Sequence, residues 1–104
     1  MFFGHLYTSL MNKVLLITGA SRGIGAATAL EAAKRGYSVC INYRQSAEAA
    51  EKILNQINLQ GGKAIAVRAD VSQEPEVVEL FKTVDKTLNP LTALVNNADY
   101  TEKQ

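Results

Sequence analysis

A short apolar run that leads straight into three closely spaced glycines constrains the fold of this chain most. The run lies in Lys13–Thr18, which carries four consecutive aliphatic residues. Such a run suits a strand that is buried on both faces, as in a parallel sheet. Gly19, Gly23 and Gly25 follow it, and an alanine-rich helix then extends to Arg35. The order of strand, glycine-rich turn and helix predicts a parallel α/β unit whose turn can bind an anion.

Apolar runs and helical stripes alternate along the rest of the chain. Two further helices are predicted, one ending at Gly61-Gly62 and one between Ser72 as N-cap and Asn89-Pro90, with Pro75 in its first turn. The first has an apolar stripe of Ala50, Ile53, Leu54 and Ile57, and the second has one of Val77, Phe81, Val84 and Leu88. The remaining strands are predicted at Ser38–Asn42, Ala64–Val67 and Leu94-Val95.

The resulting order of elements is βαβαβαβ, with connections long enough to hold helices. Parallel strands joined in this way cross over with a right hand. The predicted fold is therefore α/β, an incomplete doubly wound (Rossmann) parallel sheet of four strands in the order 3-2-1-4 with three helices. The first two helices should cover one face of the sheet, and the third should cross to the other.

Each glycine of the turn has an expected purpose. Gly19 permits the tight turn out of the strand, Gly23 lets the backbone approach the phosphates of a dinucleotide, and Gly25 lets the helix pack closely. The turn also contains three other candidate cofactor-binding residues, Ser21, Arg22 and Ile24.

Three other interpretations of the turn compete with dinucleotide binding. An ordinary strand-to-helix connection remains the plainest of them. A nucleoside-triphosphate loop is excluded because no Lys-Ser/Thr pair follows the last glycine. A methyltransferase turn lacks its usual acidic residue after the second strand.

The residues after the second strand indicate which nicotinamide cofactor is preferred. NAD-selective sites usually place Asp or Glu there to bind the ribose 2′-hydroxyl, whereas this chain has Asn42-Tyr43-Arg44. A guanidinium binds a phosphate bidentately, and Arg22 could reach the same phosphate from the glycine turn. The pattern therefore predicts NADP(H); the alternative for Arg44 is a solvated loop charge.

The spacing Thr18-Gly19-x-x-x-Gly23-x-Gly25 resembles that of the short-chain dehydrogenase/reductase family. Asp70-Val71 and Asn96-Asn97-Ala98 match two further motifs of this family, in the same order. The resemblance covers nearly all of the chain after Met11, and reductases of the bacterial 3-oxoacyl-carrier-protein and sugar-dehydrogenase types look most alike. It implies that Asp70 and Val71 contact the adenine and that Asn97 makes a cofactor-side contact. Asn96 would satisfy backbone groups at the strand end, and Tyr43 would lie beside the adenine or pack on the surface.

The resemblance also implies a catalytic set of Ser and Tyr-x-x-x-Lys, with the Tyr as general acid/base. None of Tyr7, Tyr37, Tyr43 and Tyr100 is followed by Lys four residues on. No catalytic residue is therefore assigned in this chain. The expected function is the NADP(H)-binding part of a short-chain oxidoreductase, truncated before its catalytic residues and inactive alone. The alternative is a non-catalytic module that binds NADP(H) or a partner protein.

Three segments are expected along the chain. Residues 1–10 are a non-native or mis-assigned extension before a natural start at Met11, residues 11–98 are the NADP(H)-binding half-domain, and residues 99–104 are a tail outside the family pattern. Asp99 stands where the family has Gly, and the resemblance ends there. A frameshift, a splice product or a cloning boundary at this point would produce such a tail.

Composition limits the cellular compartment and the binding partners that are expected for this chain. The net charge of +1 favours neither nucleic acid nor an anionic membrane. The apolar runs are shorter than the ~18 residues that a membrane span needs. The single cysteine, Cys40, is expected in the core, and a reduced cytoplasmic setting fits it. No metal site is expected. Full-length family members are usually homo-oligomers, and the state of this chain does not follow from its sequence.

The isolated chain is expected to be marginally stable or prone to aggregation. One helix cannot cover the second face of a four-stranded sheet, and the fourth strand is an open edge. Thermal unfolding followed by circular dichroism, together with sedimentation, measures this. A sharp, reversible transition from a soluble monomer would contradict the expectation.

Overall fold

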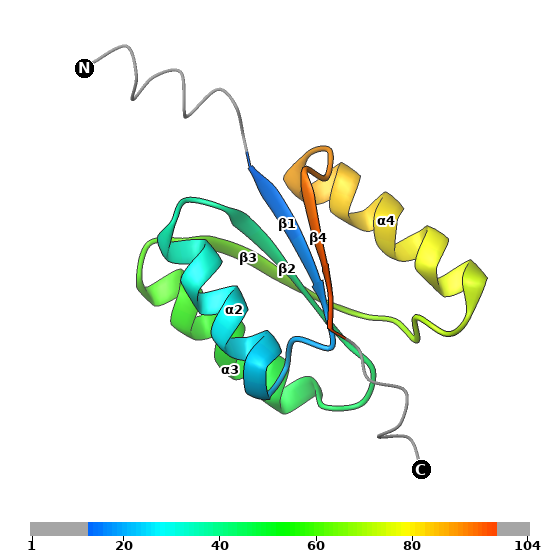
Figure 1. Ribbon diagram of the computed structural model, residues 1–104, viewed down its shortest axis with the longest axis horizontal. Helices are drawn as coiled ribbons and strands as arrows, with labels where there is room; N and C mark the ends of the chain where they lie inside the picture. Colours follow the sequence, from blue (N-terminus) through cyan, green and yellow to red (C-terminus); the bar gives the residue numbers. More distant parts are fainter. Residues whose placement is uncertain (1–12, 98–104) are drawn as a thin grey trace.

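The computed structural model describes residues 13–97, which form one parallel four-stranded sheet with helices on both faces (Figure 1). The predicted segments 1–10 and 99–104, together with Met11 and Ala98, lie outside the described residues. The strands follow the order β3-β2-β1-β4, which confirms the predicted 3-2-1-4. The elements are β1 (Val14–Thr18), α2 (Gly23–Lys34), β2 (Ser38–Tyr43), α3 (Ala47–Leu59), β3 (Lys63–Arg68), α4 (Glu74–Leu88) and β4 (Ala93–Asn96).

The alternation of side chains along the strands divides the interior into two cores. In β1 and β2, odd-numbered positions such as Ile17 and Ile41 pack with α2 and α3, and even-numbered positions such as Leu16 and Cys40 pack with α4. All five residues of β1 are buried, as expected for a strand with helices on both faces. Two helices lie on one face and α4 lies alone on the other (Figure 1), as predicted.

Helices α2 and α3 follow the sequence pattern closely. The buried face of α2 is made of small residues, Gly25, Ala26, Ala29 and Ala32, which lets the helix approach the sheet. In α3, Ala50, Ile53 and Ile57 are buried, and Leu54 packs against the same core. The predicted stripe of α3 is therefore confirmed.

Helix α4 corrects two details of the sequence analysis. It begins at Glu74, with Gln73 rather than Ser72 at the N-cap position and Pro75 in the first turn. Its buried residues are Leu80, Val84 and Leu88, spaced by four, whereas Phe81 is 43% exposed. Adjacent helix residues differ by about 100° in direction, so a face centred on Leu80 turns Phe81 toward solvent.

The outer strand β4 is the least covered part of the sheet. Leu94 pairs in register with Leu16, which is fully buried, yet Leu94 itself is 51% exposed. The difference arises because β4 is the last strand of the sheet beside β1. Within residues 13–97, no helix is long and apolar enough to cross a membrane.

Because Leu80 rather than Phe81 faces the core, truncating each of these neighbouring side chains should have a different effect on stability. We expect Leu80→Ala to lower the free energy of unfolding by about 2–4 kcal/mol, because it leaves a cavity in the α4 core. Phe81→Ala, which removes a larger but half-exposed side chain, should cost about 1 kcal/mol or less. Urea denaturation of both variants measures the difference. Equal losses would favour the stripe through Phe81 instead.

Candidate functional site

The candidate residues gather at one edge of the sheet because the four strands are parallel. Their carboxyl ends meet there, and the chain leaves each strand at that edge. In Figure 1 the turn between β1 and α2 lies next to the end of β4. Segments that are far apart in the sequence, among them the Gly19–Gly25 turn and Asn97, are thus brought together: the Asn97 side chain bonds the Gly19 carbonyl at 3.0 Å.

The glycine turn adopts a conformation that side chains would hinder. Gly19 and Gly23 have φ angles of +62° and +61°, in the left-handed region that favours glycine. A Cβ at Gly23 would have no heavy atom within 4 Å, so the space beside this backbone is open. At Gly25 a Cβ would lie 2.5 Å from the Asn97 Nδ2 and 2.7 Å from the Gly19 carbonyl oxygen. Gly25 therefore permits the close contact of α2 with the turn and with the end of β4.

Among residues 13–97, no side chain caps or neutralises the positive amino terminus of α2. Arg22 occupies its N-cap position, no side chain caps the helix, and its first turn contains no acidic residue. Helices α3 and α4 carry Glu48 and Glu74 in their first turns. The amide groups and dipole of α2 are thus left to attract an anion. Of the other turn residues, Ser21 is half-buried, and Ile24 is 80% exposed.

Asn42 is one of the residues of this edge to which the sequence assigned no role. Its side chain is buried, with 2% of the residue exposed. Its Oδ1 accepts a hydrogen bond from the Gly19 amide (3.4 Å), and its Nδ2 donates to the carbonyls of Val67 (3.3 Å) and Ala69 (3.1 Å). The Asn42 carbonyl also accepts from the Ala20 amide at 3.0 Å. The signal that could have revealed it is an amide that ends the apolar run of β2.

A second polar group ties the turn to β4. The Thr18 hydroxyl donates to the Asn96 Oδ1 (3.1 Å) and accepts from the Asn97 amide (2.9 Å). The Asn97 Nδ2 donates to the Gly19 carbonyl at 3.0 Å. Asn96 was expected to hydrogen-bond backbone groups at the end of the strand. The side chain of Asn97 forms such a bond instead, and this bond holds the side chain against the turn. Its contact with a cofactor stays a prediction.

The loops after β2 and β3 are joined through Arg68 and Glu76. Arg68 ends β3, and its Nε donates to the Arg44 carbonyl at 3.2 Å. The Glu76 Oε1 accepts from the Arg68 Nη1 (3.0 Å) and from the Asp70 amide (2.7 Å). The Asp70 Oδ1 in turn accepts from the amide and the hydroxyl of Ser72, at 3.0 and 2.7 Å. Arg44 and Asp70 were predicted from the sequence, whereas Arg68 and Glu76, which connect them, were not.

The remaining candidates lie beside the two cores. Tyr43 is half-buried and packs against the core on the α2 and α3 side, and Val71 packs against the α4 core. Cys40 is fully buried, as predicted, and burial raises the pKa of its thiol to about 12. The thiol therefore stays protonated at neutral pH and is no nucleophile.

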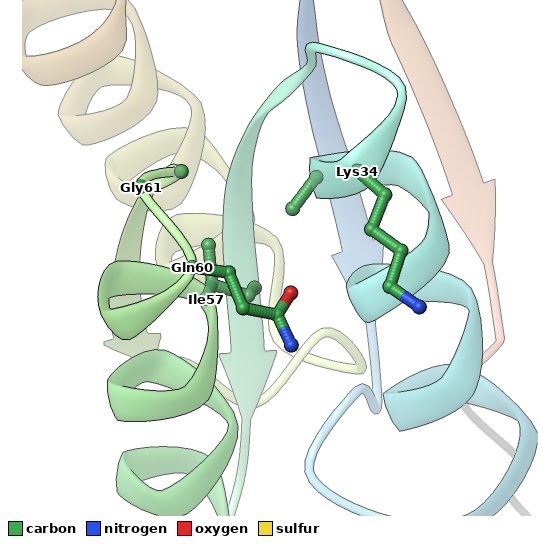
Figure 2. Close-up of a pocket in the computed structure, with 6 residues that line it drawn as sticks. Lys34, Ile57, Gln60 and Gly61 are labelled. Carbon is green, nitrogen blue, oxygen red and sulfur yellow. The ribbon is translucent and has the colours of Figure 1, made fainter.

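An open hollow lies at the other end of α2 and α3, away from these residues. It has a volume of about 350 Å³ and is lined by Ala33, Lys34, Ile57, Gln60, Gly61 and Gly62. Figure 2 shows the side chains of Lys34 and Gln60 on its two sides. The helices end here and begin at the glycine-turn edge, so this hollow is separate from the candidate site.

The chain is similar to known proteins over nearly the same residues that form this fold. The family described as short chain dehydrogenase matches residues 13–104. A 3-oxoacyl-[acyl-carrier-protein] reductase of Synechocystis sp. is 48% identical over 90% of this chain and 38% of its own length. An uncharacterized oxidoreductase of Escherichia coli (strain K12) is 51% identical over 82% of this chain and 34% of its own. The chain thus spans about a third of the length of these relatives.

Solved structures give the same fold. A short-chain dehydrogenase/reductase from Serratia marcescens superposes with a TM-score of 0.80 at 35% identity, over 83% of this chain and 35% of its own. An alternative dihydrofolate reductase from Brucella canis, complexed with NADP, superposes with a TM-score of 0.78 at 39% identity, over 85% and 34%.

The hydrogen bonds of Asn42 predict a structural role for this residue. We expect Asn42→Ala to lower the free energy of unfolding by about 2 kcal/mol or more, because the Gly19 amide and two carbonyls lose their partner. Asn58→Ala, which truncates an exposed asparagine on α3, is the matched control and should change stability by less than about 0.5 kcal/mol. Chemical denaturation compares them, and similar values for both would refute the role.

Proposed function

Because this chain belongs to the short-chain dehydrogenase family, we propose that it is the NADP(H)-binding part of an oxidoreductase. The Gly19–Gly25 turn and the first turn of α2 hold the pyrophosphate. The observation that carries the proposal is the amino terminus of α2, which has neither a capping side chain nor an acidic residue beside it. Open space at Gly23 leaves room for a phosphate group next to the backbone amides.

The preference for NADP(H) over NAD(H) rests on charge. Arg44 follows β2, where NAD-selective sites carry a carboxylate, and Arg22 is exposed at the N-cap of α2. Neither arginine belongs to an ion pair among residues 13–97. Both cations are therefore available to a 2′-phosphate. That the similar Brucella canis protein is complexed with NADP supports the same choice.

The adenine would lie between the loops that follow β2 and β3. Asp70 and Val71 come directly after β3 and its buried neighbour Ala69, and Tyr43 is the last residue of β2. Asn97 would lie on the nicotinamide side, at the end of β4. When bound, the cofactor supplies hydride transfer at its nicotinamide ring. The substrate of the whole protein is proposed to be a carbonyl compound or the corresponding alcohol, in line with the reductase from Synechocystis sp..

Titration calorimetry of the full chain with NADPH and with NADH tests this function. We expect tighter binding of NADPH, and Arg44→Asp should lower the ratio of the two affinities by about tenfold or more, since a carboxylate repels the 2′-phosphate. Lys52→Asp makes the same change of charge at an exposed position on α3 and should leave the ratio unchanged. If neither dinucleotide binds to the folded wild-type chain, the proposed function is wrong. An unaltered ratio in Arg44→Asp would reject only the role of Arg44.

A further inference from the structure

We propose that Arg68 and Glu76 are positioning residues for cofactor selectivity, which hold the main chain of Arg44 so that its guanidinium faces the 2′-phosphate. This inference rests on the proposed function. It assigns the discrimination between NADP(H) and NAD(H) to a pair of residues that need not touch the cofactor.

Arg68 forms hydrogen bonds within the protein through its Nε and Nη1 atoms. It lies at the carboxyl end of β3, opposite Tyr43 in the sheet register. Its Nε donates to the Arg44 carbonyl at 3.2 Å, which fixes the peptide group just beyond β2. The planar guanidinium presents its Nε and Nη1 donors in a fixed geometry, so a second bond at Nη1 determines where the first can form. Arg68 thereby restrains the backbone from which the Arg44 side chain extends.

Glu76 supplies that second bond and connects it to the loop after β3. One of its oxygens accepts from both the Arg68 Nη1 (3.0 Å) and the Asp70 amide (2.7 Å). Glu76 lies in the first turn of α4, where a carboxylate is also stabilised by the helix dipole. The backbone of Arg44 and the backbone of Asp70 are thus held through one carboxylate, although they follow different strands. These are the two segments expected at the 2′-phosphate and at the adenine.

The ion pair with Glu76 also makes Arg68 differ from Arg44, because only the charge of Arg68 is compensated. The positive charge of Arg68 is compensated by Glu76 at 3.0 Å, whereas Arg44 has no ion pair within the described part of the chain. A compensated cation attracts a phosphate less than an uncompensated one at the same distance. Arg44 is therefore the cation that a 2′-phosphate would meet, and Arg68 acts through it.

A double-mutant cycle on the full chain tests this. The probes are adenosine 2′,5′-bisphosphate and adenosine 5′-monophosphate, which differ only in the 2′-phosphate, and the readout is the ratio of their dissociation constants by calorimetry. We expect Arg68→Gln to reduce the selectivity for the bisphosphate roughly three- to tenfold, the effect of losing an exposed charge-assisted hydrogen bond. In an Arg44→Gln background, Arg68→Gln should add little, since residues that act as one unit are not additive.

Two further variants complete the test. Arg68→Lys keeps the charge but lacks the planar pair of donors, so it should lose selectivity as Arg68→Gln does. Arg35→Gln removes another exposed arginine, whose Nε is paired with Glu31 at 3.0 Å, and it should leave the ratio unchanged. Circular dichroism confirms that each variant is folded, and Arg68→Lys serves should Arg68→Gln fail to fold.

The outcomes separate this inference from the proposed function. Full selectivity in Arg68→Gln or in Arg68→Lys would overturn the positioning role. Additive losses in the double variant would also overturn it, because Arg68 would then bind the phosphate independently of Arg44. If the wild-type chain binds both probes equally, the preference for NADP(H) is itself wrong. Should the chain bind neither probe, the dinucleotide site is wrong as well.

Discussion

The buried amide of Asn42 is the interaction on which the candidate site depends most. Parallel strands diverge after their carboxyl ends, and the backbone groups there lose their partners in the sheet. Asn42 satisfies such groups on both sides of β2, since it accepts from Gly19 and donates to Val67 and Ala69. A buried polar group without a partner costs about 1–3 kcal/mol, so one side chain that serves several of them holds the edge together. Within residues 13–97, no buried polar side-chain atom is left without a partner.

The glycine turn is held from its other side by β4. Thr18 bonds both Asn96 and Asn97, and Asn97 bonds the Gly19 carbonyl. This contact requires a glycine at position 25, because a Cβ there would meet the Asn97 amide and the turn backbone below 3 Å. The conformation of the turn, the start of α2 and the end of β4 therefore depend on one another. Bonds within the protein hold the turn in this conformation, and such restraint reduces the entropy that binding must overcome.

Acidic and basic residues occupy different parts of this edge. The first turn of α2 lacks acidic residues, whereas the first turn of α4 has Glu74 and Glu76. Glu76 neutralises Arg68 and bonds the Asp70 amide, so the negative charge of α4 supports the protein rather than opposing an anion. Arg22 and Arg44 remain outside the ion pairs of the described residues. The positive end of α2 and these two arginines make the edge suited to a phosphorylated ligand.

Much of the fold could be predicted from the sequence because its signals are local. The four aliphatic residues after Lys13 indicate a strand buried on both faces, and the glycine spacing specifies the turn that follows it. The lengths of the connections then indicate parallel strands, and the usual doubly wound arrangement predicts the order β3-β2-β1-β4, which the structure has. The phase of α4 could not be settled in this way. Two apolar stripes overlap in that helix, and only packing against β1 and β2 selects Leu80 over Phe81.

The amino-acid sequence by itself thus determined the order of the elements and the glycine turn, and it predicted Arg22, Arg44, Asp70 and Asn97 as residues of the edge where the strands end. Only the tertiary structure decided how that edge is held. Gly19, Val67 and Ala69, which bond the Asn42 side chain, lie 23 to 27 residues away along the chain, and Arg68 and Arg44 are separated by 24. Bonds over such distances leave no periodic pattern in a sequence. They exist because the sheet register places the ends of β2 and β3 side by side.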